Sequence, residues 1–246
     1  MSSQQQKVAL VTGASRGIGA EIARRLAADG FAVAINYANS AAEANKLVSE
    51  LRAAGAQAVA IQADMAQPEQ VRALFTQCEQ QLGALDVLVN NAGIMQTMPL
   101  ADTTDELFAQ TFAVNVQGVF ACLREAATRL NEGGRIINLS TSALALKMPG
   151  YAIYNASKAA VEAMTQVFSK ELRGRQITVN AVAPGPVETE LFLNGKTVEM
   201  VQRLAHMSPL ERLGQPEDIA AVVSFLASAE GGWINGQVLR ANGGIA

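Results

Sequence analysis

Short apolar runs alternate with amphipathic stretches along almost the whole chain of 246 residues. The runs with the length and composition of buried strands fall at 8–12, 31–36, 56–62, 86–90, 135–140, 177–183 and 237–240. The first helical pattern places Ile18, Ile22 and Leu26 at steps of four, which is the spacing of one helix face. The expected helices cover 17–28, 41–54, a stretch after Pro68, 104–130 as two helices that meet near Asn115, 153–173 and 216–227.

The expected strands are too apolar to keep one face in water. Strands that are buried on both faces and alternate with helices form a parallel sheet with helices on either side. No Pro-rich, Ser-rich or charged linker divides the chain. We therefore expect one doubly wound α/β domain that spans residues 1–246.

The composition argues against several kinds of function. Half of the residues are apolar, the formal net charge is −3, and no cluster of Lys and Arg is present to neutralise a row of phosphates, so nucleic acid is not an expected partner. One histidine, His206, and two cysteines, Cys78 and Cys122, cannot build a zinc cage or a disulfide framework, and they leave little room for a Ser-His-Asp hydrolase. We expect no metal site, a surface position for His206, and cysteines that pack in the core.

The start of the chain bears on its location. Its first residues, Met-Ser-Ser-Gln-Gln-Gln-Lys, lack the pattern of a signal peptide. The apolar runs are far shorter than the roughly 20 residues that a bilayer requires. We expect a cytoplasmic protein with reduced thiols and no membrane partner.

A glycine-rich turn lies where the first strand meets the first helix. It reads Thr12-Gly13-Ala14-Ser15-Arg16-Gly17-Ile18-Gly19, with the glycines spaced as Gly-x-x-x-Gly-x-Gly. Glycine at such a junction lets the backbone turn tightly and lets a pyrophosphate approach the free amides of the helix N-terminus. A plain tight turn is the alternative. The position between a buried strand and a helix with an Ile/Leu face favours a dinucleotide site.

Further motifs follow this turn at wide intervals. They are Asn90-Asn91-Ala92-Gly93, Tyr154-Asn155-Ala156-Ser157-Lys158, and the run from Asn180 to Gly185 that reads Asn-Ala-Val-Ala-Pro-Gly. In this order and at these spacings across the whole chain, they resemble the motifs of the short-chain dehydrogenases/reductases. The resemblance implies a Rossmann fold whose parallel strands follow the order 3-2-1-4-5-6-7.

The end of the second strand bears on the choice of nicotinamide cofactor. Enzymes of this topology that use NAD usually carry an acidic residue there, which accepts from the ribose hydroxyls. Here the segment reads Asn36-Tyr37-Ala38-Asn39-Ser40, with no acid to repel a 2′-phosphate. We expect Arg16 to reach that phosphate and Asn36, Asn39 and Ser40 to donate to it, so NADP(H) is predicted over NAD(H). The alternative is that Arg16 is a solvated surface residue.

The resemblance implies the rest of the cofactor site. Asp64 resembles the adenine-binding aspartate of the family, Asn91 to Gly93 would line adenine and ribose, and Thr189 resembles the threonine that holds the nicotinamide carboxamide. From the residues alone, Asn91 is equally a turn former. The expected cofactor-binding set is Gly13, Ser15, Arg16, Gly17, Ile18, Gly19, Asn36, Asn39, Ser40, Asp64, Asn91, Ala92, Gly93, Tyr154, Lys158, Pro184, Gly185, Val187 and Thr189.

Tyr154 and Lys158 are four residues apart on an expected helix, so their side chains share one face. Free tyrosine has a pKa of about 10, too high for efficient proton exchange at neutral pH. A nearby ammonium and a positively charged nicotinamide favour the phenolate. We therefore expect Lys158 to lower the pKa of Tyr154 and to make it the general acid/base without any histidine.

A second hydroxyl is needed to hold the oxygen of the reacting carbonyl. Ser140-Thr141-Ser142 ends the fifth strand, and Thr141 stands where the family usually has serine. Thr141 or Ser142 is the expected donor, and Ser140 ranks third because strand alternation turns it away from Thr141. The resemblance also assigns Asn115 a water-mediated link to the lysine, although an Asn there can equally cap the next helix.

These residues predict an NADPH-dependent reductase of a ketone or other carbonyl, with reversible oxidation of a secondary alcohol. The segment 188–209 is the expected substrate-binding lid. Its apolar residues indicate an apolar or aromatic ketone or an acyl chain, and they are Leu191, Phe192, Leu193, Met200 and Met207.

Other functions remain open at this point. A 3-oxoacyl-[acyl-carrier-protein] reductase needs a basic patch for its acidic carrier, for which Arg173 and Arg175 are candidates, but the turn at 129–134 is not notably basic. The Pro149-Gly150-Tyr151 loop and the C-terminal residues look closer to the branch that resembles hydroxynaphthalene reductases, so a general carbonyl reductase is slightly favoured. A non-catalytic NADP sensor is disfavoured because both Tyr154 and Lys158 are present. The family further implies a homotetramer.

Overall fold

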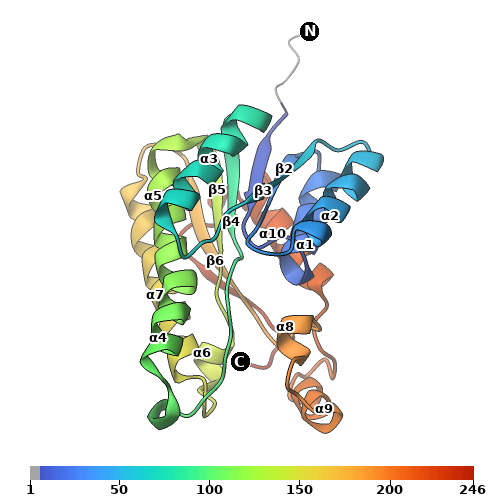
Figure 1. The fold of residues 1–246 in the computed structure, drawn as a ribbon, viewed down its shortest axis with the longest axis vertical. Helices are drawn as coiled ribbons and strands as arrows, with labels where there is room; N and C mark the ends of the chain where they lie inside the picture. The colour runs from blue at the N-terminus through green and yellow to red at the C-terminus, as the bar shows by residue number, and fades with distance from the viewer. Residues whose placement is uncertain (1–5) are drawn as a thin grey trace.

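A computed structural model describes residues 6–246, and this part of the chain forms one parallel sheet of seven strands (Figure 1). The strand order β3-β2-β1-β4-β5-β6-β7 confirms the order implied by the family resemblance. The strands are β1 (Val8–Val11), β2 (Ala32–Tyr37), β3 (Ala58–Gln62), β4 (Leu85–Asn90), β5 (Leu130–Leu139), β6 (Thr178–Pro184) and β7 (Val238–Ala241).

Each face of the sheet is covered by its own group of helices. Neighbouring residues of β1 serve different cores: Ala9 and Val11 pack with α1 (Gly17–Ala28), α2 (Ala41–Ala53) and α10 (Pro216–Ala227). Val8 and Leu10 point the other way and pack with α3 (Pro68–Leu82), α5 (Gly118–Arg129) and α7 (Ala152–Glu171). This alternation follows from the two-residue repeat of a strand, and it explains why the strands carry no polar face.

The helical stretch around Asn115 is interrupted without being broken. Helix α4 (Asp105–Phe112) runs into a π-helical turn (η2, Ala113–Gln117) and then into α5. The backbone keeps right-handed helical angles at both flanking residues, Phe112 and Gly118. The expected junction near Asn115 is confirmed, and π-helical turns of this kind are frequent at functional sites.

The remaining elements are short and gather at the carboxyl ends of the strands or at the edges. They are η1 (Leu100–Asp102), α6 (Ala143–Leu146), α8 (Glu190–Leu193), α9 (Val198–His206) and η3 (Glu230–Trp233). Strand β5 begins earlier than expected because Leu130 is buried and pairs with Leu85, after which the register shifts before Arg135 pairs with Val87. In Figure 1, α8 and α9 extend beyond the lower end of the sheet, and the C terminus lies between α6 and α8.

The two cysteines and the single histidine have the burial that the sequence analysis predicts. Cys78 and Cys122 are buried free thiols, and burial raises the pKa of each to about 12, so they are packing residues and not nucleophiles. His206 is exposed at the end of α9. Among residues 6–246, no helix combines the length and the apolar character needed to cross a bilayer.

Candidate active site

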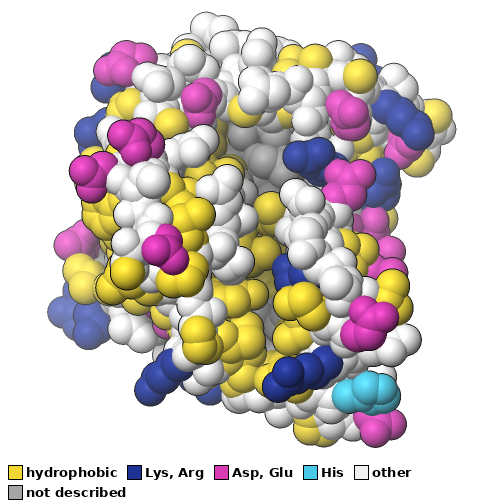
Figure 2. Space-filling model, turned by 60° about the horizontal axis from the view of Figure 1, so that its bottom comes forward, with side chains coloured by type: hydrophobic (Ala, Val, Ile, Leu, Met, Phe, Trp, Pro, Cys, Tyr) yellow, Lys and Arg dark blue, Asp and Glu magenta, His cyan; other side chains and the backbone are white. Residues whose placement is uncertain are grey.

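A cavity of about 900 Å³ opens at the carboxyl ends of the strands, where the chain order reverses between β1 and β4. Ligands of open α/β sheets bind at this switch point. The glycine turn and the residues that follow β2, β3 and β4 line one end, and the end of β5, the start of α7 and the loop after β6 line the other. Figure 2 shows the hollow between two flanks of the molecule, with hydrophobic side chains along its walls. Its volume is at the upper end of the range for small-molecule sites, as a dinucleotide with a substrate requires.

The glycine turn has the backbone that an anion site needs. Gly13 and Gly17 adopt left-handed φ values of 61° and 57°, and a Cβ atom on Gly13 would stand 2.8 Å from the Cα of Ala92. Within residues 6–246, no side chain caps the N-terminus of α1 and no acidic residue occupies its first turn. The first amides of α1 therefore remain available, and the site fits the pyrophosphate of a dinucleotide.

Asn36 has a structural role that differs from the expected one. Its Oδ1 accepts from the amide of Gly13 at 3.0 Å, and its Nδ2 donates to the carbonyls of Ala63 at 3.0 Å and Ile61 at 3.3 Å. The side chain is buried, and these backbone groups occupy both of its amide protons. The expectation that Asn36 donates to a 2′-phosphate is wrong; it holds the glycine turn in place. Asn39 and Ser40 line the same end of the cavity.

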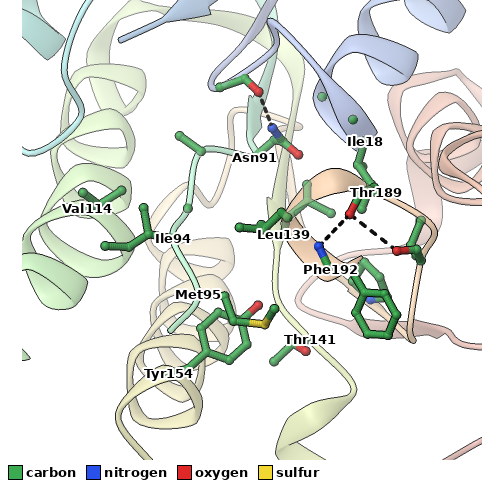
Figure 3. Close-up of a pocket in the computed structure, with 18 of the residues that line it drawn as sticks. Ile18, Asn91, Ile94, Met95, Val114, Leu139, Thr141, Tyr154, Thr189 and Phe192 are labelled. Carbon is green, nitrogen blue, oxygen red and sulfur yellow. Dashed lines mark hydrogen bonds between the residues drawn. The ribbon is translucent and has the colours of Figure 1, made fainter. Parts of the chain in front are cut away.

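Asn91 also holds the turn. Its Nδ2 donates to the carbonyls of Thr12 and Gly13, both at 2.9 Å, and its amide donates to the Thr12 hydroxyl at 3.0 Å. The turn-forming alternative therefore describes its hydrogen bonds, while Asn91, Ala92 and Gly93 also line the cavity wall (Figure 3). Asp64 lines the cavity as well, with one carboxylate oxygen accepting from the amide of Ala66 at 2.9 Å.

Arg16 forms an ion pair across the mouth of the cavity. Its guanidinium lies 3.2 Å from the carboxylate of Glu190, the first residue of α8, and both side chains are largely exposed. Arg16 therefore lines the cavity with an exposed side chain that is paired with a carboxylate. Glu190 was not among the expected site residues, because no local pattern joins two residues 174 positions apart.

Tyr154 and Lys158 share one face near the start of α7, as their spacing predicts. Lys158 is 5% exposed as a residue, and its ammonium donates to the carbonyl of Leu139 at 2.7 Å and lies 6.0 Å from the ring centroid of Tyr154. Burial lowers the pKa of Lys158 to about 8. Burial also raises the pKa of Tyr154 to about 12, which the neighbouring Thr141 hydroxyl only partly offsets. The expected lowering of the tyrosine pKa is therefore not found, because desolvation outweighs the influence of the neighbouring groups.

The three hydroxyls at the end of β5 point in different directions. Ser140 donates to the carboxylate of Glu162 at 2.6 Å, and Ser142, 2% exposed, donates to the carbonyl of Ala183 at 2.9 Å. Thr141 lies beside Tyr154 in the cavity, and its oxygen accepts from the amide of Ala143 at 3.1 Å (Figure 3). Of the two expected donors, the geometry favours Thr141 over Ser142.

Asn115 joins the loop after β4 to α7. Its Oδ1 accepts from the amide of Ile94 at 2.9 Å, and its Nδ2 donates to the carbonyl of Ile94 at 2.9 Å and to the hydroxyl of Ser157 at 3.1 Å. A Cβ atom on Gly93 would stand 3.3 Å from Asn115 Oδ1 and 3.4 Å from Lys158 Nζ, so the two side chains meet over this glycine. The alternative that Asn115 caps a helix is wrong, because the chain stays helical through the π turn.

The segment 188–209, which the sequence predicts to be a lid, contributes fewer side chains to the cavity than expected. Leu191 and Phe192 of α8 and Leu204 of α9 line it. Met200 and Met207 are 50% and 42% exposed, and neither they nor Leu193 line the cavity, so the prediction that these three side chains form its apolar lining is wrong. Thr189 caps α8 by accepting from the amide of Phe192 at 3.2 Å (Figure 3).

Several residues at the Tyr154 end were missed by sequence reasoning. Uncharged side chains line this end, namely Met95, Gln110, Leu146, Met148 and Tyr151. Two of them have a local signal: Met95 follows the Asn-Asn-Ala-Gly motif by two residues, and Tyr151 precedes Tyr154 by three, within reach of the same helix face. The others belong to segments whose placement depends on the whole fold. Figure 3 labels Met95 and Tyr154, both of which line the cavity.

Comparisons with known proteins agree with this geometry. The family described as enoyl-(acyl carrier protein) reductase matches residues 13–246. A short-chain type dehydrogenase/reductase of Picea abies is 48% identical over 97% of this chain and 92% of its own length. A chloroplastic NADPH-dependent aldehyde reductase-like protein of Arabidopsis thaliana is 44% identical over 97% and 93%. The crystal structure of a blue fluorescent protein from a metagenomic library in complex with NADPH has 42% identity and a TM-score of 0.93, covering 98% of both chains. Fold, motifs and relatives together place this chain in the short-chain dehydrogenase/reductase family.

Proposed function

We propose that the protein is an NADP(H)-dependent reductase of uncharged ketones and aldehydes. The observation that carries the proposal is that one cavity joins the anion-binding turn at α1 to the paired hydroxyls of Thr141 and Tyr154. The side chains around these hydroxyls are apolar or uncharged, which suits a neutral carbonyl compound. The Arabidopsis relative is named as an NADPH-dependent aldehyde reductase-like protein, in agreement with this substrate class.

NADPH, when bound, supplies a hydride for the carbonyl carbon. The Tyr154 hydroxyl then gives its proton to the carbonyl oxygen, and the Thr141 hydroxyl donates a hydrogen bond to the same oxygen. A pKa of about 12 keeps the Tyr154 phenol protonated at neutral pH, which is the state that an acid needs. Lys158 places a positive charge behind Tyr154 and favours the phenolate that remains after the proton is given. Asn115 holds the Ile94 loop and Ser157 around this lysine. The reverse oxidation of a secondary alcohol uses the same groups.

The choice of NADP(H) over NAD(H) is supported by the residues after β2. Asn39 and Ser40 are uncharged and line the cavity where an acid would repel a 2′-phosphate. Arg16 stands at the same cavity and supplies the positive charge. The other expected residues of the cofactor site, including Ser15, Ile18, Pro184, Gly185 and Val187, also line the cavity.

Reduction of 3-oxoacyl groups on an acyl carrier protein is the second candidate function. The contacts of Arg175 and Arg129 support it less well than reduction of a free carbonyl compound. Arg175 already binds Glu132 at 2.7 Å and two backbone carbonyls, and Arg129 pairs with Glu79 and Glu125. Arg175 follows the end of α7 and donates to the carbonyl of Leu130, the neighbour of Arg129 in the chain, and the helical rise of α7 separates Tyr154 from Glu171 by about 25 Å. These arginines therefore lie far from the end of the cavity that contains Tyr154. An acidic carrier protein bound there would contact such arginines only if a second copy of the chain supplied them.

We further propose that residues 188–209 act as the substrate lid and that the protein works as a cytoplasmic homotetramer. Two groups of exposed apolar side chains support the assembly. Phe108, Phe120 and Val167 lie on α4, α5 and α7, whereas Phe225 and the 98% exposed Trp233 lie near the sheet edge at β7. The free thiols Cys78 and Cys122 are consistent with a reducing compartment. Light scattering after gel filtration tests the tetramer.

An NADPH-oxidation screen tests the proposed activity. Its panel contains aliphatic and aromatic aldehydes, aromatic ketones, cyclic diketones and 3-oxoacyl thioesters with and without an acyl carrier protein, each assayed with NADPH and with NADH. We expect turnover of neutral aldehydes or ketones with NADPH and a large loss in Tyr154→Phe. NADPH binding without oxidation across the panel would instead support a non-catalytic cofactor sensor, and turnover only of carrier-bound thioesters would support the second candidate.

A further inference from the structure

The C-terminal tail, residues 242–246, contacts both the active-site corner and the lid. Asn242 follows β7, and its Nδ2 donates to the hydroxyl of Ser142 at 3.0 Å and to the carbonyl of Ala246 at 3.0 Å. Its Oδ1 accepts from the amide of Gly244 at 2.9 Å. One amide side chain thus shapes the tail and holds it against the residue that follows Thr141.

Ser142 follows Thr141 in the chain, and both its amide and its hydroxyl form hydrogen bonds with neighbouring segments. The amide of Ser142 donates to the carbonyl of Pro184 at 2.8 Å, and its hydroxyl donates to Ala183 while accepting from Asn242. Because Ser142 directly follows Thr141 in the chain, a displacement of Ser142 would also displace Thr141. Asn242 also packs against the loop after β6, since a Cβ atom on Gly185 would stand 2.9 Å from its Cα.

The same tail receives the carboxyl end of the lid. Ser208, 4% exposed, donates through its hydroxyl to the carbonyl of Gly243 at 2.8 Å and accepts from the amide of Leu210 at 3.2 Å. Gly243 and Gly244 have left-handed φ values of 65° and 87°, and side chains on them would press on Ser208 and Pro209. The paired glycines are therefore required by both the backbone and the close approach of the lid.

A second cavity lies beside the hydrogen bond between Ser208 and Gly243. A space of about 270 Å³ lies between lid and tail, and its lining includes Leu204, Ser208, Asn242 and Gly243. Leu204 also lines the main cavity from α9. Because the packing beside it is incomplete, the Ser208–Gly243 hydrogen bond is a defined support for this end of the lid.

We propose that Asn242 and Ser208 are positioning residues, which through the tail hold Thr141 and the substrate lid in a fixed relation to each other. The proposal rests on the proposed reductase function for its kinetic consequences. Displacement of a reacting group by about 1 Å can cost about 100-fold in rate, so a small shift of the Thr141 corner has a measurable effect. A looser lid instead weakens the binding of the carbonyl substrate.

Asn242→Ala and Ser208→Ala test the two contacts in the full-length chain. We expect Asn242→Ala to lower kcat about tenfold while the Kd for NADPH stays within twofold. We expect Ser208→Ala to raise KM for the carbonyl substrate about fivefold with kcat nearly unchanged. Because both act through one tail, the effects of the double variant should be smaller than the product of the single effects.

Asn235→Ala is the matched control. Asn235 precedes β7, at the end of the strand away from the tail, and its side chain accepts from the amide of Val179 at 2.9 Å. It should cost similar thermal stability without the changes in kcat or KM. If Asn242→Ala does not fold, Asn242→Asp replaces it, since this variant keeps the acceptor for Gly244 but loses the donor to Ser142.

Limited trypsin digestion measures how readily the lid, residues 188–209, opens to protease, and it does not depend on catalytic activity. Cleavage after Lys196 and Arg203, both inside the lid, should be about fivefold faster in Ser208→Ala than in the wild type and the control. Unchanged lid cleavage, or an Asn242→Ala kcat equal to that of Asn235→Ala, would overturn the proposal. If Ser208→Ala is cleaved faster in the lid but the wild type itself reduces no carbonyl compound, the proposed function is wrong, whereas the contact between tail and lid is supported.

Discussion

The ammonium of Lys158 donates to the main-chain carbonyl of Leu139, the last residue of β5, at 2.7 Å, and it lies 6.0 Å from the ring centroid of Tyr154. The bond fixes α7 to the strand that carries Thr141. It also keeps the lysine in a buried position where its charge is costly, which lowers its pKa to about 8. The protonated phenol and the charged lysine of the proposed mechanism therefore coexist mainly below a pH of about 8.

The rate of reduction should fall as the pH rises through about 8. The Lys158 pKa is depressed, so its charge is present below about 8 and lost above it, while the Tyr154 phenol stays protonated up to about 12. We expect kcat/KM for reduction to be flat at neutral pH and to decline by about pH 9, one unit above the lysine pKa, because kcat/KM reports groups of the free enzyme. In Lys158→Arg the side chain stays charged, so the weaker activity of this variant should lack that decline. A wild-type rate that rises between neutrality and pH 9 contradicts the assignment.

Thr141 and Ser142 should respond differently to loss of their hydroxyls. Thr141→Ala removes the group that faces the substrate and should lower kcat about 100-fold, as loss of an oxyanion donor does. Ser142→Ala removes two hydrogen bonds, one donated to Ala183 and one accepted from Asn242, and should lower the free energy of unfolding by about 2 kcal/mol, with a smaller loss of kcat through the displaced corner. Thr141→Ser, which keeps the hydroxyl, is the control and should retain most activity. Steady-state kinetics together with urea unfolding separate the two, and the reverse ranking would make Ser142 the donor.

Arg16 should determine the preference for the 2′-phosphate. Arg16→Ala should raise KM for NADPH about tenfold or more by removing charge-assisted hydrogen bonds, while KM for NADH stays nearly constant. Arg24→Ala is the control, because Arg24 is an exposed arginine of α1 that pairs with Glu21 and Glu50. Equal losses with both cofactors would place Arg16 elsewhere in the site.

The Arg16–Glu190 ion pair should compete weakly with cofactor. Both side chains are exposed, so the pair is worth at most about 1 kcal/mol. Glu190→Gln frees the guanidinium and should tighten NADPH binding by no more than about fivefold, with less effect at high salt. Fluorescence titration with NADPH measures this, and weaker binding in Glu190→Gln would show that the glutamate helps to hold the cofactor.

The fold was predictable because its signals are local. Strand alternation, the glycine turn and the four-residue spacing of Tyr154 and Lys158 each depend on a few neighbouring residues, and the structure confirms the elements they predict. The main exception is β5, whose early start depends on pairing with Leu85 across the sheet. A register of that kind has no signature in one strand alone.

The roles of individual polar side chains were harder to predict. Asn36 has the right chemistry for a phosphate, but the carbonyls of Ile61 and Ala63, brought close by β3, take its protons first. The pKa of Tyr154 depends on how far its surroundings remove the phenol from water, which helix spacing does not show. In α9, an amphipathic pattern is compatible with more than one orientation, and the structure directs Leu204 to the cavity while Met200 lies outward.

A single-turnover experiment on Tyr154→Phe tests the central claim most directly. The wild type and the variant are loaded with NADPH, mixed with the best aldehyde or ketone from the screen, and followed for NADPH loss and alcohol formation. The account predicts one alcohol formed per NADPH consumed in the wild type. It also predicts a rate at least about 100-fold lower in Tyr154→Phe with the Kd for NADPH unchanged. Equal rates in the two proteins, or NADPH loss without alcohol, would contradict it.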